Sequence, residues 1–168
     1  MLTLKKFDYS VMEWIERRLK TKRMDRLMLW STRLGDGGAL WLLLAFLLIC
    51  GKNTRHAGFA LLLCVALCAV VGNFAIKPIF KRTRPCNINF SFPLLLKRPV
   101  DSSFPSCHTL TSFAAAATVC QAGGLLGAAS FFFASLISFS RMYLYVHYPS
   151  DVLIGALIGV AAGRFFFS

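Results

Sequence analysis

Long apolar runs separated by short polar and basic stretches dominate this chain. After a charged N-terminal stretch, the apolar runs cover residues 27–50, 58–76, 104–120, 125–140 and 152–167. Each run approaches the roughly 20 residues that an α-helix needs to cross about 30 Å of hydrocarbon. The pattern therefore predicts an all-α integral membrane bundle of about five transmembrane helices.

The N-terminal residues 5–23 follow a different pattern. Apolar side chains recur there at helical spacing, with charged residues on the opposite side, as in a helix that lies on a membrane surface. We expect an amphipathic interfacial helix that anchors the protein, or one that guides lipid toward a site. The apolar positions are Phe7, Val11, Trp14, Ile15 and Leu19.

Composition agrees with a membrane protein of one domain. The 168 residues are 57% hydrophobic and 15% charged, with a mean hydropathy of +0.62, far from soluble averages. We expect residues 1–168 to form a single domain, with the interfacial helix in 1–25 and the transmembrane core in 26–168. The net charge of +12 comes from 19 Lys and Arg residues that gather at membrane boundaries. A lipid bilayer or an anionic lipid, rather than nucleic acid, is the expected partner.

Three polar blocks interrupt the apolar pattern, each at the end of a run. The first follows the second run, the second opens the third run, and the last lies between the fourth and fifth runs. Because consecutive crossings alternate in direction, these run ends share one membrane face. The blocks are residues 77–85, from Lys77 to Arg84 and Pro85; Pro105, Ser106, Cys107 and His108; and Ser140, Arg141, His147 and Asp151.

This set of side chains suits a phosphate ester. Lys77, Arg84 and Arg141 can neutralise phosphate oxygens, the arginines through bidentate contacts. Ser106 and the backbone N–H groups of the first turn of the third crossing offer further donors, where the helix dipole favours an anion. Pro105 at the first helical position and Ser103 as N-cap would start that helix.

The two histidines of the blocks suggest two chemical roles. Asp151 follows His147 by four residues, and a carboxylate on one imidazole nitrogen would make the other a better nucleophile. His108 has no obvious carboxylate near it in the sequence, which suits a proton donor to the leaving group. The sequence thus predicts that catalysis uses His147, His108 and Asp151.

The spacing of the blocks resembles the three signatures of the type 2 phosphatidic acid phosphatase superfamily, over about 75 residues. The resemblance implies that His147 becomes phosphorylated, that Asp151 orients it, and that His108 protonates the leaving oxygen. It also implies phosphate binding by Lys77, Arg84, Ser106, Cys107 and Arg141, with no metal and no cofactor.

Cys107 departs from that family pattern, which usually has glycine there. Its backbone N–H remains available if the thiol turns away. Cys86 and Cys107 both flank the blocks, so a disulfide is one interpretation and two free thiols is the other, which we prefer.

Two charges stand inside the first apolar run. Arg33 and Asp36 lie at helical spacing and can pair with each other, although a charge within a membrane segment is also a candidate functional residue. We expect the structural ion pair.

Three functions follow from the sequence. Small bacterial members of the family hydrolyse isoprenyl diphosphates, so the first expectation is removal of the terminal phosphate of undecaprenyl diphosphate through a phosphohistidine. A broader lipid phosphatase acting on phosphatidic acid or phosphatidylglycerol phosphate is the alternative. A non-catalytic lipid-binding or transport protein is the alternative of another class, and the oligomeric state is left open.

Two arguments give opposite answers for the side of the membrane on which the site lies. Sixteen of the 19 Lys and Arg residues fall on the face of the blocks, and the positive-inside rule would place that face in the cytoplasm. The family resemblance implies the extracytoplasmic face of the cell membrane, which is our expectation.

Overall fold

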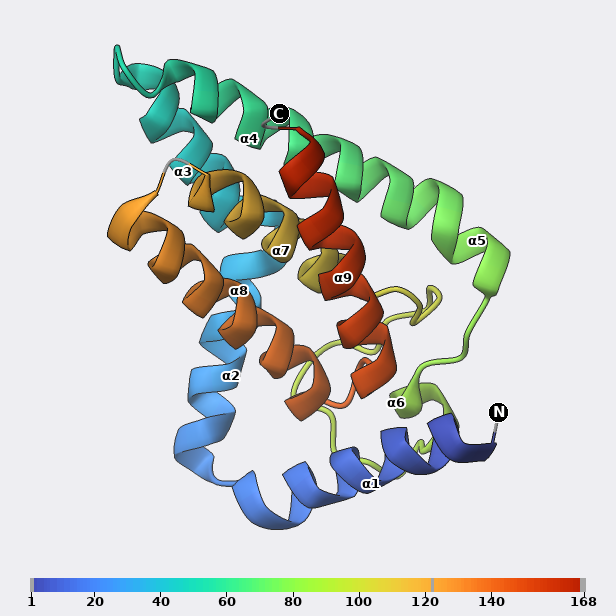
Figure 1. The fold of residues 1–168 in the computed structure, drawn as a ribbon. Coiled ribbons are helices and arrows are strands. Elements are labelled where there is room, and N and C mark those ends of the chain that lie inside the picture. Colours follow the sequence, from blue (N-terminus) through green and yellow to red (C-terminus); the bar gives the residue numbers. More distant parts are fainter. Residues whose placement is uncertain (1, 122, 167–168) are drawn as a thin grey trace.

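Helices form the framework of the computed structural model, which describes residues 2–121 and 123–166 (Figure 1). Within these residues, three stretches are long and apolar enough to cross a membrane: Lys22–Cys50, Arg55–Ile88 and Gly124–Tyr143. Two shorter helices, α7 (Cys107–Cys120) and α9 (Pro149–Phe165), complete the bundle. The all-α membrane fold is confirmed, while the count of five crossings stays a prediction.

Helix α1 (Leu2–Leu19) lies crosswise beneath the ends of the other helices (Figure 1). One face, with Met12 and Ile15, is buried against the bundle, whereas Phe7 and Trp14 are exposed. The predicted apolar face is therefore shared between the protein and the surroundings. The helix ends at Leu19, and Thr21 caps the next helix by accepting the Met24 N–H at 3.2 Å, so the expected boundary at residue 25 was too late.

The first predicted crossing is a broken helix. It consists of α2 (Lys22–Gly35), the 3-10 turn η1 (Asp36–Gly38) and α3 (Ala39–Cys50). Gly37 and Gly38 have φ angles of 60° and 73°, a left-handed conformation that glycine adopts without steric cost. The break places Asp36 in the bundle beside the polar blocks.

The second predicted crossing continues beyond its expected end. Helix α4 (Arg55–Val70) passes through a π-turn, η2 (Val71–Ile76), into α5 (Lys77–Phe80). The apolar run ends at residue 76, but the helix continues through Pro78 to Phe80. The Lys77 N–H donates to the Gly72 carbonyl, five residues earlier in the chain. In a regular α-helix the ring of Pro78 would clash with the carbonyl four residues before it, and the wider π-turn relieves this clash.

The other helix starts also differ from expectation. Helix α7 begins at Cys107 with Ser106 as N-cap, rather than at residue 104 with Ser103. Helix α8 (Gly124–Tyr143) is longer than the fourth apolar run. Helix α9 takes Tyr148 as N-cap, because the Asp151 carboxylate accepts the Tyr148 N–H at 2.9 Å. Position 167, the expected end of the fifth run, lies outside the described residues.

Glycines let α9 pack closely on α7. A Cβ on Gly159 would lie 2.5 Å from the Leu110 carbonyl oxygen, and one on Gly163 would lie 2.3 Å from that of Ala114. Small residues at every fourth position are the usual device for such close approach in membrane helices.

All three polar blocks lie on the same side of the bundle as α1 (Figure 1). That side carries α5, the short helix α6 (Pro85–Ile88), the start of α7, the end of α8 and the start of α9. The convergence that we predicted from the alternation of crossings is present in the fold.

Candidate active site

A cavity of about 310 Å³ opens where the blocks meet. It contains cations and imidazoles from α5, α7, α8 and two connecting segments, whereas Ser106 and Asp151 are not among its lining residues. The lining residues are Gly35, Gly37, Gly38, Ala69, Asn73, Lys77, Arg84, Pro99, Asp101, Cys107, His108, Thr111, Arg141 and His147.

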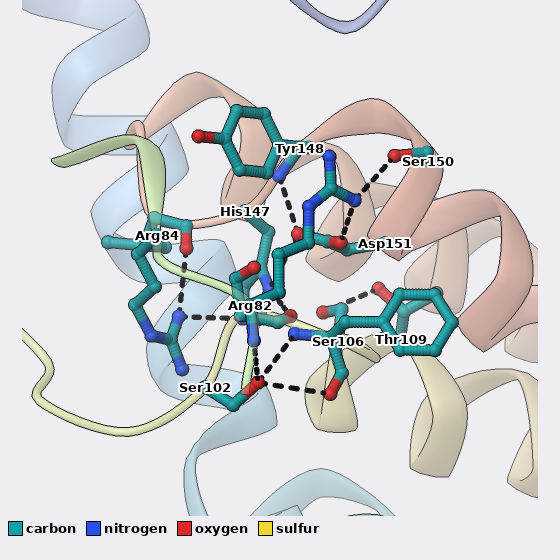
Figure 2. Close-up of polar contacts among 12 residues, drawn as sticks. Arg82, Arg84, Ser102, Ser106, Thr109, His147, Tyr148, Ser150 and Asp151 are labelled. Atoms are coloured by element: carbon teal, nitrogen blue, oxygen red, sulfur yellow. Dashed lines mark hydrogen bonds and ion pairs between the residues drawn. The ribbon is translucent and has the colours of Figure 1, made fainter. Parts of the chain in front are cut away.

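His147 is held in one orientation by backbone. Its Nδ1 lies 2.7 Å from the Ser103 carbonyl oxygen, and its Nε2 lies 2.9 Å from Arg84 Nη1 (Figure 2). A carbonyl only accepts and a guanidinium only donates, so the proton sits on Nδ1 and Nε2 keeps its lone pair. Burial lowers the pKa of His147 well below its ordinary value, and the charges of Arg84 and Arg141 lower this pKa further. The imidazole is therefore neutral at pH 7, as a nucleophile needs to be.

Asp151 contacts His147 less directly than we expected. Its Oδ2 is 3.7 Å from His147 Nδ1, beyond hydrogen-bond distance, and the Ser103 carbonyl takes the place that we assigned to the carboxylate. Its Oδ1 instead accepts Arg82 Nη1 at 2.6 Å (Figure 2). The carboxylate can still stabilise a positive charge on the ring at this distance.

Asp8 joins α1 to the same network. This fully buried carboxylate accepts Arg82 Nη2 at 2.7 Å, and it also accepts the backbone N–H and the hydroxyl of Ser150. Arg82 thus bridges two buried carboxylates, Asp8 and Asp151. The interfacial helix is fastened to the start of α9, behind the site.

His108 has a carboxylate partner that its sequence neighbourhood did not reveal. Asp36 Oδ1 lies 2.9 Å from His108 Nε2, joining η1 to α7. The expected pair of Arg33 with Asp36 was wrong, since Arg33 lies over the Trp30 ring, 5.5 Å from its centroid. A charge within an apolar run was the sequence signal for Asp36. Its contact with His108 is consistent with the interpretation of Asp36 as a functional residue.

The three predicted phosphate-binding cations differ in their partners. Lys77 Nζ and Arg84 Nη2 both donate to Asp101, at 2.5 and 2.9 Å. Arg141 donates through Nη1 to Thr32, while its Nε is buried and has no hydrogen-bond partner in the described part of the chain. A buried donor without an acceptor is costly. An anion bound in the cavity, which Arg141 lines, could supply an acceptor to this guanidinium.

The start of α7 offers fewer free donors than we expected. The Ser106 N–H donates to the Asp151 carbonyl at 3.3 Å, and the buried Ser106 hydroxyl accepts Thr109 Oγ1 at 3.0 Å (Figure 2). The fold therefore uses Ser106 to join α7 to α9. A direct bond from Ser106 to phosphate would require these contacts to change.

Cys107 is accommodated by a glycine on the neighbouring helix. Its Sγ donates to Asn73 Oδ1 at 3.3 Å, and a Cβ on Gly72 would lie only 2.8 Å from this sulfur. The thiol is thus turned toward η2. Cys86 and Cys107 are both free, as we preferred.

Comparison with known proteins identifies the family of this chain. Residues 57–168 match the model of the PAP2 superfamily. An undecaprenyl-diphosphatase of Sulfolobus acidocaldarius is 33% identical over 71% of this chain, and the match spans 58% of that relative's length. Undecaprenyl-diphosphatase BcrC of Bacillus subtilis is 28% identical over 86% of this chain and 74% of its own.

Relatives with other names and solved structures also match. A lipid A 4′-phosphatase of Bacteroides thetaiotaomicron is 32% identical over 61% of this chain and 54% of its own. The crystal structure of Aquifex aeolicus LpxE superposes with a TM-score of 0.79 and 29% identity, over 95% of this chain and 93% of that one. The family model matches more than half of this chain, residues 57–168. The chain therefore belongs to the PAP2 superfamily, and the relatives named above include phosphatases of membrane lipids.

Proposed function

We propose that this protein is a lipid phosphatase that removes the terminal phosphate of an isoprenyl diphosphate, with undecaprenyl diphosphate as the first candidate. The observation that carries the proposal is one cavity lined by two histidines and three cations. The unpartnered Nε of Arg141 supports an anionic ligand there. The two relatives named undecaprenyl-diphosphatase support the choice of substrate.

Lys77, Arg84 and Arg141 would bind the terminal phosphoryl group and neutralise its charge. Arg84 currently donates to the lone pair of His147 Nε2. Its transfer to a phosphate oxygen would free that lone pair and hold the phosphorus atom in front of it. Such positioning is a large part of phosphoryl-transfer catalysis.

His147 Nε2 would then attack phosphorus in line with the leaving oxygen. The new N–P bond forms as the P–O bond to the lipid breaks, and the departing oxygen takes a proton from His108. Water would hydrolyse the phosphohistidine in the second step, giving its proton to His108, which returns both histidines to their starting states. This is covalent catalysis with one group acting first as acid and then as base.

The partners of the two rings fit these roles. The Ser103 carbonyl keeps the proton of His147 on Nδ1, and Asp151 at 3.7 Å stabilises the cationic phosphohistidine. Asp36 accepts a hydrogen bond from His108 Nε2 and stabilises its imidazolium. This contact supports His108 as the proposed proton donor.

A broader lipid phosphatase is the second candidate. The cavity residues named above are suited to a phosphoryl group rather than to a particular lipid, and the relative named lipid A 4′-phosphatase supports a wider substrate range. Phosphatidic acid and phosphatidylglycerol phosphate are the test substrates for this candidate.

A substrate panel tests the proposal. Purified protein in detergent, with a chelator present, is given a prenyl diphosphate, phosphatidic acid and phosphatidylglycerol phosphate, and inorganic phosphate release is measured. We expect the highest kcat/KM for the prenyl diphosphate and no loss of activity with chelator. Absence of release from every lipid, with the lipids still bound, would instead support a lipid-binding or transport protein.

We further propose that the site faces the extracytoplasmic side of the cell membrane. Helix α1 and the polar blocks share one face, so one reporter fused to the N-terminus reads the side of both. An outside reporter is expected, and a cytoplasmic one would favour the charge count over the family resemblance.

A further inference from the structure

A carboxylate already binds two of the cations that the proposed function assigns to phosphate. Asp101 lies in the loop between α6 and α7, where its Oδ2 accepts Lys77 Nζ at 2.5 Å and its Oδ1 accepts Arg84 Nη2 at 2.9 Å. Arg84 Nε also donates to the Asp101 backbone carbonyl at 3.0 Å. The two carboxylate oxygens thus bridge the cations in the way that two oxygens of a phosphoryl group would.

Asp101 also stands between two cavities. Beside the cavity that contains His147 lies a second one of about 550 Å³, which extends over Lys81 and Arg82. Asn73, Lys77, Arg84 and Asp101 line both cavities. The Asp101 side chain is 48% exposed, so it has room to leave the cations without burying its charge.

The electrostatics of Asp101 indicate that it is ionised. Burial alone would raise its pKa, but the hydrogen bond from Lys77 and the charge of Arg84 outweigh this and bring the pKa below its ordinary value. An ionised carboxylate and a phosphoryl dianion on the same two cations would repel each other strongly in a partly buried site. The two anions therefore exclude each other.

We propose that Asp101 is an internal competing anion that sets the affinity of the site, because the phosphoryl group of the substrate has to displace it from Lys77 and Arg84. The inference rests on the proposed function, since it concerns the same cations. A phosphate dianion brings more negative charge to Lys77 and Arg84 than the carboxylate does, whereas a phosphodiester monoanion brings only the same charge. The free energy needed to displace Asp101 is the same for both ligands, so Asp101 lowers the affinity of the site for every anion.

A purely structural role for Asp101 predicts the opposite result. If the carboxylate only aligned Lys77 and Arg84 for the substrate, its loss would loosen both cations and weaken phosphate binding. The sign of the change in affinity therefore separates the two interpretations.

The test measures binding of inorganic phosphate to the full-length protein in detergent by titration calorimetry. In Asp101→Asn, which keeps the side-chain shape and the backbone carbonyl, the Kd for phosphate is expected to fall about tenfold, the scale of one lost competing charged contact. Dimethyl phosphate, a monoanion that has to displace the same carboxylate, should gain affinity by a similar factor. Asp101→Ala should shift both ligands in the same direction.

Asp25→Asn is the matched control. Asp25 also binds a lysine and a second donor, Lys20 at 3.3 Å and the Tyr143 hydroxyl at 2.8 Å, but it does not line the cavity. Its phosphate Kd should equal that of the wild type. An unchanged or higher Kd for phosphate in both Asp101 variants would overturn the proposal. Because no turnover is needed, this outcome is independent of whether the protein hydrolyses lipids.

Discussion

The two cavity histidines are held in opposite ways. The His147 side chain is 2% exposed, bonded to a backbone carbonyl and next to two arginines, while that of His108 is 22% exposed and bonded to a carboxylate. Burial and the charges of two arginines favour the neutral His147 ring, whereas the charge of a carboxylate favours a protonated ring. The difference supports the proposed roles of His147 as nucleophile and His108 as proton donor.

The largest expected loss of activity follows from removing the proposed nucleophile, His147. His147→Ala should lower kcat by about 10⁴-fold or more on every lipid phosphate, because it removes the nucleophile of the proposed covalent intermediate. Steady-state phosphate release measures this. His56→Ala is the control, since His56 is exposed at the start of α4, about 30 Å along the helix from Lys77. Similar losses in both variants would contradict the assignment.

Changing His108 should affect substrates unequally. An alkoxide leaving group needs a proton, while a departing lipid phosphate is a much weaker base. His108→Ala should therefore lower kcat by about 10²–10⁴-fold on phosphatidic acid and far less on a prenyl diphosphate. Parallel assays of the two substrates measure the ratio. An equal loss on both would mean that His108 is not the proton donor.

Asp36→Asn should reproduce the His108 pattern at smaller size. Loss of a hydrogen bond to a charged partner should lower kcat on phosphatidic acid by about tenfold, with little change on the diphosphate. Arg33→Gln, at the position that we first expected to pair with Asp36, should leave both rates unchanged. If the Arg33 variant were the impaired one, the Asp36–His108 contact would not be the functional one.

Arg84→Gln should raise the pKa of His147, because a positive neighbour that disfavours the imidazolium is removed. NMR titration of ¹³C-labelled histidine rings measures this pKa directly. The pKa rises toward its ordinary value, so protonation of His147 begins at a higher pH than in the wild type. Arg55→Gln, at the other end of α4, should produce no shift, and an unchanged pKa in Arg84→Gln would contradict the electrostatic account.

The smallest catalytic effect is expected at Asp8. Asp8→Asn weakens the buried contacts to Arg82 and Ser150, and should lower the free energy of unfolding by about 2 kcal/mol. Thermal unfolding in detergent measures this change. The substrate ratio that identifies His108 should stay as in the wild type, since Asp8 supports the site from behind.

The hydrophobic pattern was sufficient to predict the helices and the convergence of the blocks, because both follow from run length and alternation. The partners of the histidines were not predictable in this way. His108 reaches Asp36 because Gly35 lacks a Cβ, which would lie 2.9 Å from the His108 ring, and such packing has no signature in spacing. Ser103 reaches His147 across 44 residues, and Asp101 lies in a loop without periodicity.

The proposed mechanism depends most on His147 Nε2 as the attacking atom. Trapping the protein during turnover of a labelled prenyl diphosphate, followed by peptide mapping and ³¹P NMR, identifies the phosphorylated atom. We predict an acid-labile phosphate on Nε2 of His147, absent from His147→Ala. Phosphate on Nδ1, on another residue, or on no residue while hydrolysis proceeds would contradict it.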